Sequence, residues 1–255
     1  MKLKGKITFI TGATAGIGES CARMFAAQGS NLIITGRREE KLHKLAESLR
    51  NDFGVNVLSA AIDVRSYDDM KKLVDNLPTE FKNIDILINN AGKAVGLDTI
   101  QEGKLDDWEE MIDTNIKGLL YATRLVAPIM VERKAGFIIN ISSIAGRHAY
   151  PKGNVYCATK AATRTLSESM VIDLNGTGVR VCNIDPGMVE TEFSLVRFKG
   201  DEERAANVYK SFTPLSPDDI AEIALFTATR PAHVMIQDIM VTPTAQASAY
   251  IVDKK

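Results

Sequence analysis

The stretch Lys6-Ile7-Thr8-Phe9-Ile10-Thr11-Gly12-Ala13-Thr14-Ala15-Gly16-Ile17-Gly18 decides the fold of this chain of 255 residues. Its first half is apolar and β-branched, which is typical of a buried strand, and a helical pattern begins at Glu19. Three glycines stand between them, in the spacing Gly-x-x-x-Gly-x-Gly. Glycine permits a sharp turn and a close approach of the backbone to a ligand, and the start of a helix attracts anions. The stretch therefore predicts a strand, a turn and a helix that hold a pyrophosphate, rather than a turn that serves only helix–sheet packing.

Six further apolar runs follow the first one, and helical patterns separate most of them. Several are nearly continuous in Val, Ile and Leu, as expected of parallel strands covered by helices on both faces. No linker, repeat or low-complexity stretch interrupts the alternation, so we expect residues 1–255 to form a single α/β domain. The predicted strands are Lys6–Thr11, Asn31–Thr35, Asn56–Ile62, Ile84–Asn89, Gly136–Ser142, Val179–Ile184 and Met235–Val241.

Two helix starts support this alternation, and one segment departs from it. Ser66 is followed by two aspartates, and Ser216 is followed by Pro217 and two aspartates, which is typical of capped helix N-termini. The exception is the charged, amphipathic stretch at residues 188–215, which lies between a predicted strand and a predicted helix. Segments of this kind often cover a binding site, so we expect a substrate lid there.

The composition favours a small-molecule partner over a nucleic acid or a membrane. The formal net charge is −1 and there is no long basic run. Cys21, Cys157 and Cys182 are widely spaced, so neither a disulfide framework nor a metal site is expected. The first apolar run, Ile7–Ile10, is too short for a signal sequence or a membrane span. We therefore expect a cytoplasmic protein.

The end of the second predicted strand indicates which dinucleotide is bound. Many dinucleotide-binding proteins have an acid here for the ribose 2′-hydroxyl, but this chain has Arg37 and Arg38. A planar, permanently charged guanidinium matches the oxygens of a 2′-phosphate, so NADP is favoured over NAD, and either arginine could hold the phosphate. Asp63, which precedes Val64 at the end of the third strand, is placed to bond an adenine amino group or to cap the next helix.

Tyr156 and Lys160 are four residues apart, so on a helix both side chains project from the same face. A phenol with a pKa of about 10 transfers protons poorly near neutrality, and a neighbouring cation stabilises the phenolate. Alone, the spacing is better explained by a half-buried tyrosine beside a solvated lysine. Together with the glycine turn, the turn Asn89-Asn90-Ala91-Gly92 and the pair Ser142-Ser143, it indicates an acid–base site.

These motifs together resemble the short-chain dehydrogenase/reductase family, over the whole length of the chain. The resemblance implies a single Rossmann-like domain with a doubly wound, seven-stranded parallel sheet, and an NADP-dependent oxidoreductase that acts on CH–OH groups. It also implies a homotetramer, in which helices near residues 105–132 and 155–175 pair between subunits. The catalytic tetrad that it implies is Asn115, Ser143, Tyr156 and Lys160.

The resemblance also gives each of these residues a role. Ser143 and Tyr156 are expected to bond the substrate oxygen, and Tyr156 to pass it a proton. Lys160 is expected to lower the pKa of Tyr156 and to bond the nicotinamide ribose, and Asn115 to hold a water that links Lys160 to solvent. The residues expected to bind NADP are Gly12, Thr14, Gly16, Ile17, Gly18, Arg37, Arg38, Asp63, Val64, Asn90, Ala91, Gly92, Tyr156, Lys160, Pro186, Gly187, Val189 and Thr191.

Within the family, the run Val189–Asp201 looks like the NADP-dependent 3-hydroxy acid dehydrogenases, which also oxidise serine and L-allo-threonine. The segments Gly153–Tyr156 and Arg230–Val234 are similar to that group as well. The expected reaction is the oxidation of a short 3-hydroxy acid, such as 3-hydroxypropionate, and its reversal. Arg197 is expected to receive the substrate carboxylate through two parallel hydrogen bonds, or else to face solvent as part of the lid.

Other functions remain open on the sequence alone. A 3-oxoacyl carrier-protein reductase, or another short-chain carbonyl reductase, would share the tetrad and NADP, although the last predicted strand lacks the glycines usual in the former. A non-catalytic NADP sensor is disfavoured by the intact set of Ser143, Tyr156 and Lys160. Arg147 and His148 follow the Ser143 turn and match no motif.

Overall fold

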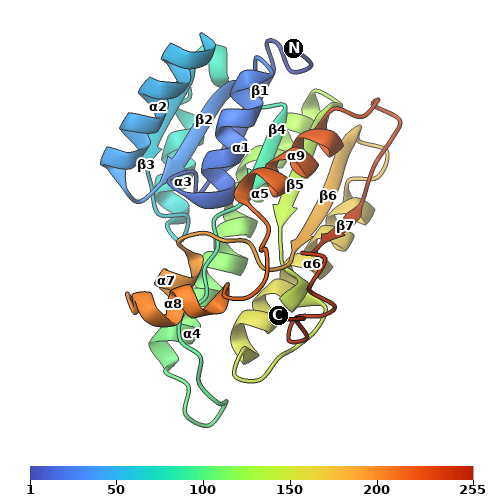
Figure 1. The fold of residues 1–255 in the computed structure, drawn as a ribbon. Coiled ribbons are helices and arrows are strands. Elements are labelled where there is room, and N and C mark those ends of the chain that lie inside the picture. Colours follow the sequence, from blue (N-terminus) through green and yellow to red (C-terminus); the bar gives the residue numbers. More distant parts are fainter. Residues whose placement is uncertain (255) are drawn as a thin grey trace.

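A parallel sheet of seven strands runs through the middle of the molecule in the computed structural model, which describes residues 1–254 (Figure 1). The strands lie in the order β3-β2-β1-β4-β5-β6-β7. Each of the seven predicted strands is present, with its ends shifted only slightly, so the predicted α/β class is confirmed. The strands are β1 (Ile7–Thr11), β2 (Asn31–Gly36), β3 (Val57–Ala61), β4 (Ile86–Asn89), β5 (Gly136–Ile141), β6 (Val179–Pro186) and β7 (Asp238–Val241).

The order of the strands reverses beside β1. This strand pairs with β2 on one side and with β4 on the other. Strand β3 lies outside β2, and β5, β6 and β7 follow β4 toward the opposite edge. In open parallel sheets such a reversal leaves a crevice beyond the carboxyl ends of the strands, where ligands bind. The arrangement is the doubly wound, Rossmann-like sheet that the family resemblance implied.

Helices cover both faces of the sheet (Figure 1). One core cluster includes Phe25, Leu42 and Ile220 from α1, α2 and α9, and the cluster on the opposite face includes Met70, Val126 and Met170 from α3, α5 and α6. Burial on both faces is the reason that the strands are continuously apolar. The helices are α1 (Gly16–Ala27), α2 (Glu39–Phe53), α3 (Tyr67–Asp75), α4 (Leu105–Ile112), α5 (Gly118–Glu132), α6 (Asn154–Asp173), α7 (Phe193–Arg197), α8 (Glu202–Val208) and α9 (Pro217–Ala228).

Both predicted helix starts are confirmed. The Ser66 side chain accepts a hydrogen bond from the backbone N–H of Asp69 at the start of α3. Ser216 and Asp219 form a reciprocal capping box at the start of α9, with Pro217 in the first helical position. Each cap satisfies amide groups that have no partner within the helix, which fixes where the helix begins.

The helical stretch predicted between Leu105 and Glu132 contains an irregular turn. Helices α4 and α5 are joined by one π-helical turn at Asp113–Lys117, with Asn115 buried at its centre. Such turns insert an extra residue into an otherwise continuous helix and occur frequently at functional sites.

The segment expected to form a lid carries two short helices, α7 and α8. Figure 1 shows them beyond the carboxyl ends of the strands, next to α4. Within residues 1–254, none of the helices combines the length and the apolar character that crossing a membrane would require.

Candidate active site

A cavity of about 660 Å³ opens at the carboxyl ends of the strands. This volume is typical of small-molecule sites. The cavity extends from the glycine turn and Arg37 to Tyr156 and Arg197, so it joins the predicted cofactor residues to the predicted substrate residues. Every predicted site residue lines it except Gly18 and Asn115, which stand behind its wall.

The glycine turn has the shape that a phosphate-binding turn requires. Gly12 and Gly16 have φ values of +69° and +55°, which favour glycine. A side-chain carbon on Gly12 would lie 2.8 Å from the Cα atom of Ala91, and one on Gly18 would overlap the carbonyl of Gly12. Gly18 therefore packs the turn together rather than lining the cavity.

The helix after this turn has an uncapped start, and a neighbouring turn supports the glycine turn. Helix α1 follows Ala15, which has no side chain that could cap it, so the first amide groups of the helix remain available to an anion. The Asn90 side chain donates hydrogen bonds of 3.0 Å to the carbonyls of both Thr11 and Gly12. The turn after β4 is thereby fixed against the turn after β1.

The two arginines after β2 have different partners. Arg38 donates to the Thr14 hydroxyl at 2.9 Å and to a carboxylate oxygen of Glu192 at 2.6 Å. Arg37 is more than half exposed, and its closest ion pair, with Glu110, is 3.9 Å long. Of the two guanidinium groups, Arg37 is therefore the less committed to other protein groups.

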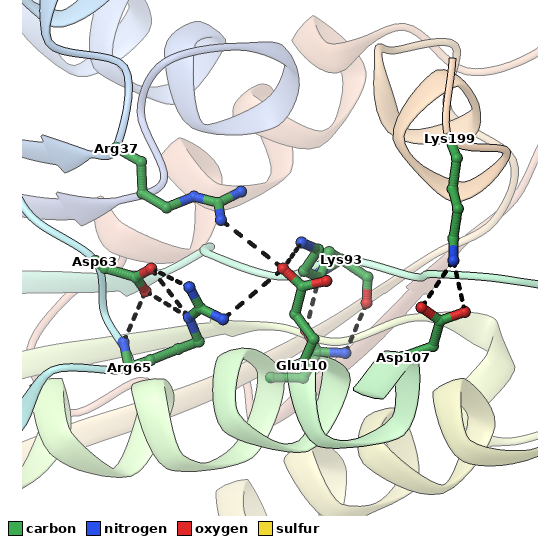
Figure 2. Close-up of polar contacts among 8 residues, drawn as sticks. Arg37, Asp63, Arg65, Lys93, Asp107, Glu110 and Lys199 are labelled. Atoms are coloured by element: carbon green, nitrogen blue, oxygen red, sulfur yellow. Dashed lines mark hydrogen bonds and ion pairs between the residues drawn. The ribbon is translucent and has the colours of Figure 1, made fainter. Parts of the chain in front are cut away.

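Asp63 belongs to a cluster of charges at the same end of the cavity. Figure 2 shows Arg65 folded against the Asp63 carboxylate, with the Arg65 Nη2 atom 2.6 Å from Oδ2. Burial alone would raise the pKa of Asp63, but the hydrogen bonds and the charge of Arg65 outweigh it and hold this pKa below its usual value. The carboxylate is thus ionised and already paired, which leaves fewer lone pairs for the adenine amino group than the sequence suggested.

Glu110, on α4, forms the centre of this cluster. Its Oε1 atom lies 2.5 Å from the Lys93 Nζ atom, 3.8 Å from Arg65 and 3.9 Å from Arg37 (Figure 2). Lys93 is buried and lines the cavity, but sequence reasoning did not identify it. Its position directly after the Asn-Asn-Ala-Gly turn was the available signal.

At the other end of the cavity lie Ser143, Tyr156 and Lys160, all of them buried. Ser143 caps a short 3-10 turn and accepts a hydrogen bond from the Ala145 N–H at 3.1 Å. The Lys160 Nζ atom donates to the carbonyl of Ile141 at 2.9 Å, and burial lowers the pKa of this lysine to about 8. Tyr156 and Lys160 are on α6, one turn apart, as the spacing predicted.

Burial and the neighbouring polar groups act in opposite directions on Tyr156. Burial raises the pKa of this phenol above its usual value, while hydrogen bonding with Ser143 and the charge of Arg197 act in the opposite direction. Lys160 projects from the same helix one turn further on, and its ammonium donates to the Ile141 carbonyl. The predicted effect of Lys160 on the pKa of Tyr156 stays a prediction.

The buried side chain of Asn115 has partners on two neighbouring elements. Its Oδ1 atom accepts from the Lys93 N–H at 2.8 Å, and its Nδ2 atom donates to the Lys93 carbonyl and to the Thr159 hydroxyl. Both amide protons are therefore used by protein groups. The side chain fixes the backbone beside Gly92, and the role of Asn115 in holding a water stays a prediction.

Residues after β6 close the substrate end. Phe193 lies against the ring of Tyr156, with a centroid distance of 5.6 Å. The Arg197 Nη1 atom donates to the Tyr150 hydroxyl at 2.7 Å, and the guanidinium carbon lies 5.7 Å from the centre of the Tyr156 ring. The buried Nε atom of Arg197 has no hydrogen-bond partner in the described part of the chain. Arg197 lines the cavity, so its positive charge stands beside the predicted catalytic tyrosine.

Pro186, Gly187, Val189 and Thr191 line the cavity as predicted. Sequence reasoning missed Gln246, a buried residue from the C-terminal part of the chain whose Oε1 atom accepts from the Met188 N–H at 2.8 Å. No local pattern marks such a residue, because its partner lies far away in the sequence.

Arg147 and His148 lie outside the cavity wall. Arg147 donates to the fully buried Asp185 at 2.5 Å and also pairs with Asp238, so it ties the Ser143 turn to β6 and β7. His148 is exposed. Arg147 therefore has a structural role, which the sequence did not predict.

Comparison with known proteins agrees with this architecture. A family model for short chain dehydrogenases matches residues 6–201. The NADP-dependent 3-hydroxy acid dehydrogenase YdfG of Salmonella typhi is 49% identical over 244 residues, which are 95% of this chain and 97% of that protein. Sulfoacetaldehyde reductase 2 of Chromohalobacter salexigens is 46% identical over 250 residues, which are 97% and 98% of the two chains. The closed form of serine dehydrogenase complexed with NADP+ has a TM-score of 0.92 at 46% identity and covers 98% of this chain and 99% of its own.

Proposed function

The chain belongs to the short-chain dehydrogenase family, and from this premise we propose that it transfers a hydride between NADP(H) and a short 3-hydroxy acid. Its substrates would be of the 3-hydroxypropionate, serine and L-allo-threonine type. The relatives named above support both halves of the proposal, because one is an NADP-dependent 3-hydroxy acid dehydrogenase and another is a serine dehydrogenase complexed with NADP+.

The cavity fits NADP. The glycine turn and the first amides of α1 would hold the pyrophosphate, since Gly12 and Gly16 leave the backbone bare there. The turn Asn90–Gly92 would lie along the ribose, and residues 186–191 beside the nicotinamide. When bound, NADP supplies the acceptor or donor of the hydride.

Arg37, rather than Arg38, would hold the 2′-phosphate. The Arg37 guanidinium is exposed and only loosely paired, whereas Arg38 already bonds Thr14 and Glu192. A group with free donors can turn toward a phosphate without breaking shorter contacts, and a guanidinium bonds phosphate oxygens in pairs.

The buried polar groups at the far end of the cavity would carry the acid–base chemistry. In reduction, negative charge develops on the substrate oxygen, and the hydroxyls of Ser143 and Tyr156 would donate hydrogen bonds to it. Tyr156 would give its proton to that oxygen. Because burial raises the pKa of this phenol, the phenol stays protonated and can act as the proton donor. Lys160 would hold the ribose and keep a positive charge near the site. Asn115 would keep the backbone beside Gly92 in place.

The observation that carries the substrate class is Arg197. Its buried Nε donor has no partner among the described residues, and its guanidinium lies beside the Tyr156 ring. Arg197 lines the cavity, and a carboxylate bound there would neutralise its charge. The relatives named above support an anionic substrate, because 3-hydroxy acids and sulfoacetaldehyde both carry an acidic group.

Assembly, compartment and the lid are part of the same proposal. Residues 188–215 would move as a lid, since α7 and α8 cover the substrate end. The protein would act as a homotetramer through α5 and α6, which expose the apolar side chains of Leu120 and Ile172. A cytoplasmic location is supported by the free state of its three cysteines.

The test is to measure NADPH formation with L-serine, L-allo-threonine, 3-hydroxypropionate and 3-hydroxybutyrate, with NADP and then with NAD. Reduction of sulfoacetaldehyde and of an acetoacetyl thioester is measured in parallel. We expect turnover of the hydroxy acids with NADP and little with NAD. Thioester reduction without oxidation of any hydroxy acid would replace the proposed substrate class with the acyl-chain alternative.

Two variants complete this experiment. Tyr156→Phe should abolish turnover and retain NADP binding, whereas a non-catalytic sensor would be unaffected. Arg37→Met should raise the KM for NADP toward that for NAD, and an equal effect of Arg38→Met would argue against the assignment of the phosphate to Arg37.

A further inference from the structure

Glu110 is an acid that faces three cations at the cofactor end of the cavity (Figure 2). Its Oε1 atom lies 2.5 Å from the Lys93 Nζ atom, 3.8 Å from the Arg65 Nη1 atom and 3.9 Å from the Arg37 Nη1 atom. Only the first of these distances is that of a hydrogen bond, since the other two exceed the usual donor–acceptor range. Glu110 therefore bonds Lys93 and attracts the two arginines by charge alone.

The pair of Lys93 and Glu110 has a fixed position. Lys93 is buried, and its backbone N–H and carbonyl both bond the Asn115 side chain, each at 2.8 Å. Glu110 belongs to α4, which continues directly into the π-helical turn that carries Asn115. Both partners are therefore anchored to the same stretch of backbone. Because Lys93 holds it, the Glu110 carboxylate can move little, and its negative charge stays at this end of the cavity.

The two arginines differ in how firmly they are held. Arg65 donates to both carboxylate oxygens of Asp63, at 2.6 Å and 3.0 Å, so its guanidinium is already committed. Within residues 1–254, Glu110 is the one acid within ion-pair distance of Arg37. Arg37 lines the cavity, whereas Glu110 does not. Glu110 is thus the partner, by charge, of the group proposed to hold the 2′-phosphate.

A phosphate on Arg37 would meet the charge of Glu110. A phosphate monoester carries about 1.5–2 negative charges at neutral pH. If Arg37 turns toward the phosphate and away from Glu110, the attraction between Arg37 and Glu110 is lost. If Arg37 keeps its place, the phosphate lies close to the Glu110 carboxylate, within the distance over which like charges repel at physiological salt. Glu110 weakens phosphate binding in either case.

We propose that Glu110 is a specificity-determining residue that competes with the 2′-phosphate of NADP for Arg37, and that Lys93 limits this competition by holding the carboxylate. The inference rests on the proposed function, because it takes NADP as the cofactor and Arg37 as its phosphate-binding residue. Glu110 reduces the affinity for NADP(H) and leaves that for NAD(H) unchanged. The lower affinity favours release of NADPH after each turnover, and product release limits the rate of many enzymes.

The decisive variant is Glu110→Gln, which removes the charge and keeps the shape of the side chain. Adenosine 2′,5′-bisphosphate and 5′-AMP, which differ only in the 2′-phosphate, are titrated calorimetrically into the protein. We expect the Kd for the bisphosphate to fall about tenfold, as removal of a like charge at short range predicts, and the Kd for 5′-AMP to stay the same. Glu109→Gln, at an exposed acid on the same helix, is the matched control and should change neither Kd.

The dependence on ionic strength distinguishes an effect of charge from an effect of shape. The gain in bisphosphate affinity in Glu110→Gln should shrink at high salt, because salt screens the interaction between partly exposed charges. Three results would overturn the proposal: a gain that does not depend on salt, an unchanged Kd for the bisphosphate, or equal gains for both ligands. Each would mean that Glu110 affects the cavity through packing or not at all.

Lys93→Met tests the restraint on Glu110. Without the Lys93 ammonium the carboxylate is free to approach Arg37, so the Kd for the bisphosphate should rise several-fold. In the background of Glu110→Gln, the same substitution should have little effect. An equal rise in both backgrounds would mean that Lys93 attracts the phosphate directly, and it would overturn the restraining role of Lys93.

The titration is independent of the reaction, because neither ligand is oxidised. A gain for the bisphosphate alone supports the competition even if none of the hydroxy acids is turned over, in which case only the proposed substrate class fails. A wild type that prefers the bisphosphate to 5′-AMP, together with no change in Glu110→Gln, overturns the inference and leaves the preference for NADP standing.

Discussion

Lys160 is a charged group that the fold buries without an ion pair. Its ammonium donates to the Ile141 carbonyl and forms no salt bridge with any residue in the described part of the chain. Removing an ammonium from water costs free energy, and the pKa of about 8 expresses that cost. Burial of Lys160 therefore does not stabilise the fold, and we propose that the residue is retained for the reaction.

Replacing Lys160 with Met should stabilise the protein while abolishing activity. The folded-state pKa is about 8 and the ordinary value is 10.5. Burial of the charged form therefore lowers the free energy of unfolding by about 3 kcal/mol at neutral pH. Loss of the hydrogen bond to Ile141 offsets part of this. Urea unfolding at pH 7 should give Lys160→Met a free energy of unfolding about 1–3 kcal/mol above the wild type.

The pH dependence has a definite sign. Between about pH 8 and 10.5 the unfolded chain holds a proton on this lysine that the folded chain has lost. The stability of the wild type therefore rises with pH in that window relative to Lys160→Met, and the difference between them shrinks. Lys44→Met, at an exposed lysine on α2, is the control and should show no such convergence. A variant that is less stable than the wild type at pH 7 would contradict this account.

The residues that the sequence could identify are those that belong to a local motif. The Tyr156 and Lys160 pair lies within one turn of one helix, and the glycine turn is one continuous stretch. Lys93, Gln246 and Tyr150 escaped notice because their roles depend on partners from distant elements. Contacts of that kind form only when the fold brings the elements together, so no local pattern predicts them.

At the scale of the secondary-structure elements, ion pairs hold the segment with α7 and α8 against the rest of the molecule. Glu192 precedes α7 and accepts from Arg38 at 2.6 Å and from Lys41 at 2.8 Å. Beyond α7, Lys199 lies 2.9 Å from both carboxylate oxygens of Asp107 on α4 (Figure 2). These ion pairs hold the helix that presents Arg197 to the cavity.

Breaking both tethers should weaken substrate binding more than stability. Each pair is partly exposed, so each contributes at most about 1 kcal/mol. Glu192→Gln combined with Lys199→Met should raise the KM for a hydroxy acid several-fold, leave Tm nearly unchanged, and speed hydrogen exchange in residues 193–208. The matched control is Glu40→Gln, which breaks an exposed pair on α2. An unchanged KM and unchanged exchange would show that the tethers do not position α7.

The seven strands and the starts of α3 and α9 were predicted because each has a local signal. Ser66 and Ser216 mark helix starts, and continuous runs of Val, Ile and Leu mark the strands. The π-helical turn around Asn115 was not predicted, because the residues on either side continue a regular helical pattern. That turn is explained by contacts across the molecule, since the Asn115 amide bonds the Lys93 backbone and Thr159.

At the scale of the whole molecule, exposed apolar side chains bear on the number of subunits. Leu120 on α5 and Ile172 on α6 expose apolar side chains, and Ile172 is 75% exposed. Both lie on the helices that the family resemblance expects to pair between subunits. We predict that sedimentation will give four chains per particle, and that Leu120→Glu will yield smaller particles. Ile100→Glu, in an exposed loop, should leave the assembly intact, and a monomeric wild type would refute the prediction.

The contact between Gln246 and Met188 has a consequence for the synthesis of the protein. The cavity is built from residues as early as Gly12 and as late as Gln246, so almost the entire chain must leave the ribosome before its wall is complete. At roughly 5–20 residues per second, the glycine turn waits many seconds for the groups that complete the substrate end. The nucleotide and substrate ends of the cavity are therefore completed together and late, because residues 186–191 and Gln246 belong to its wall.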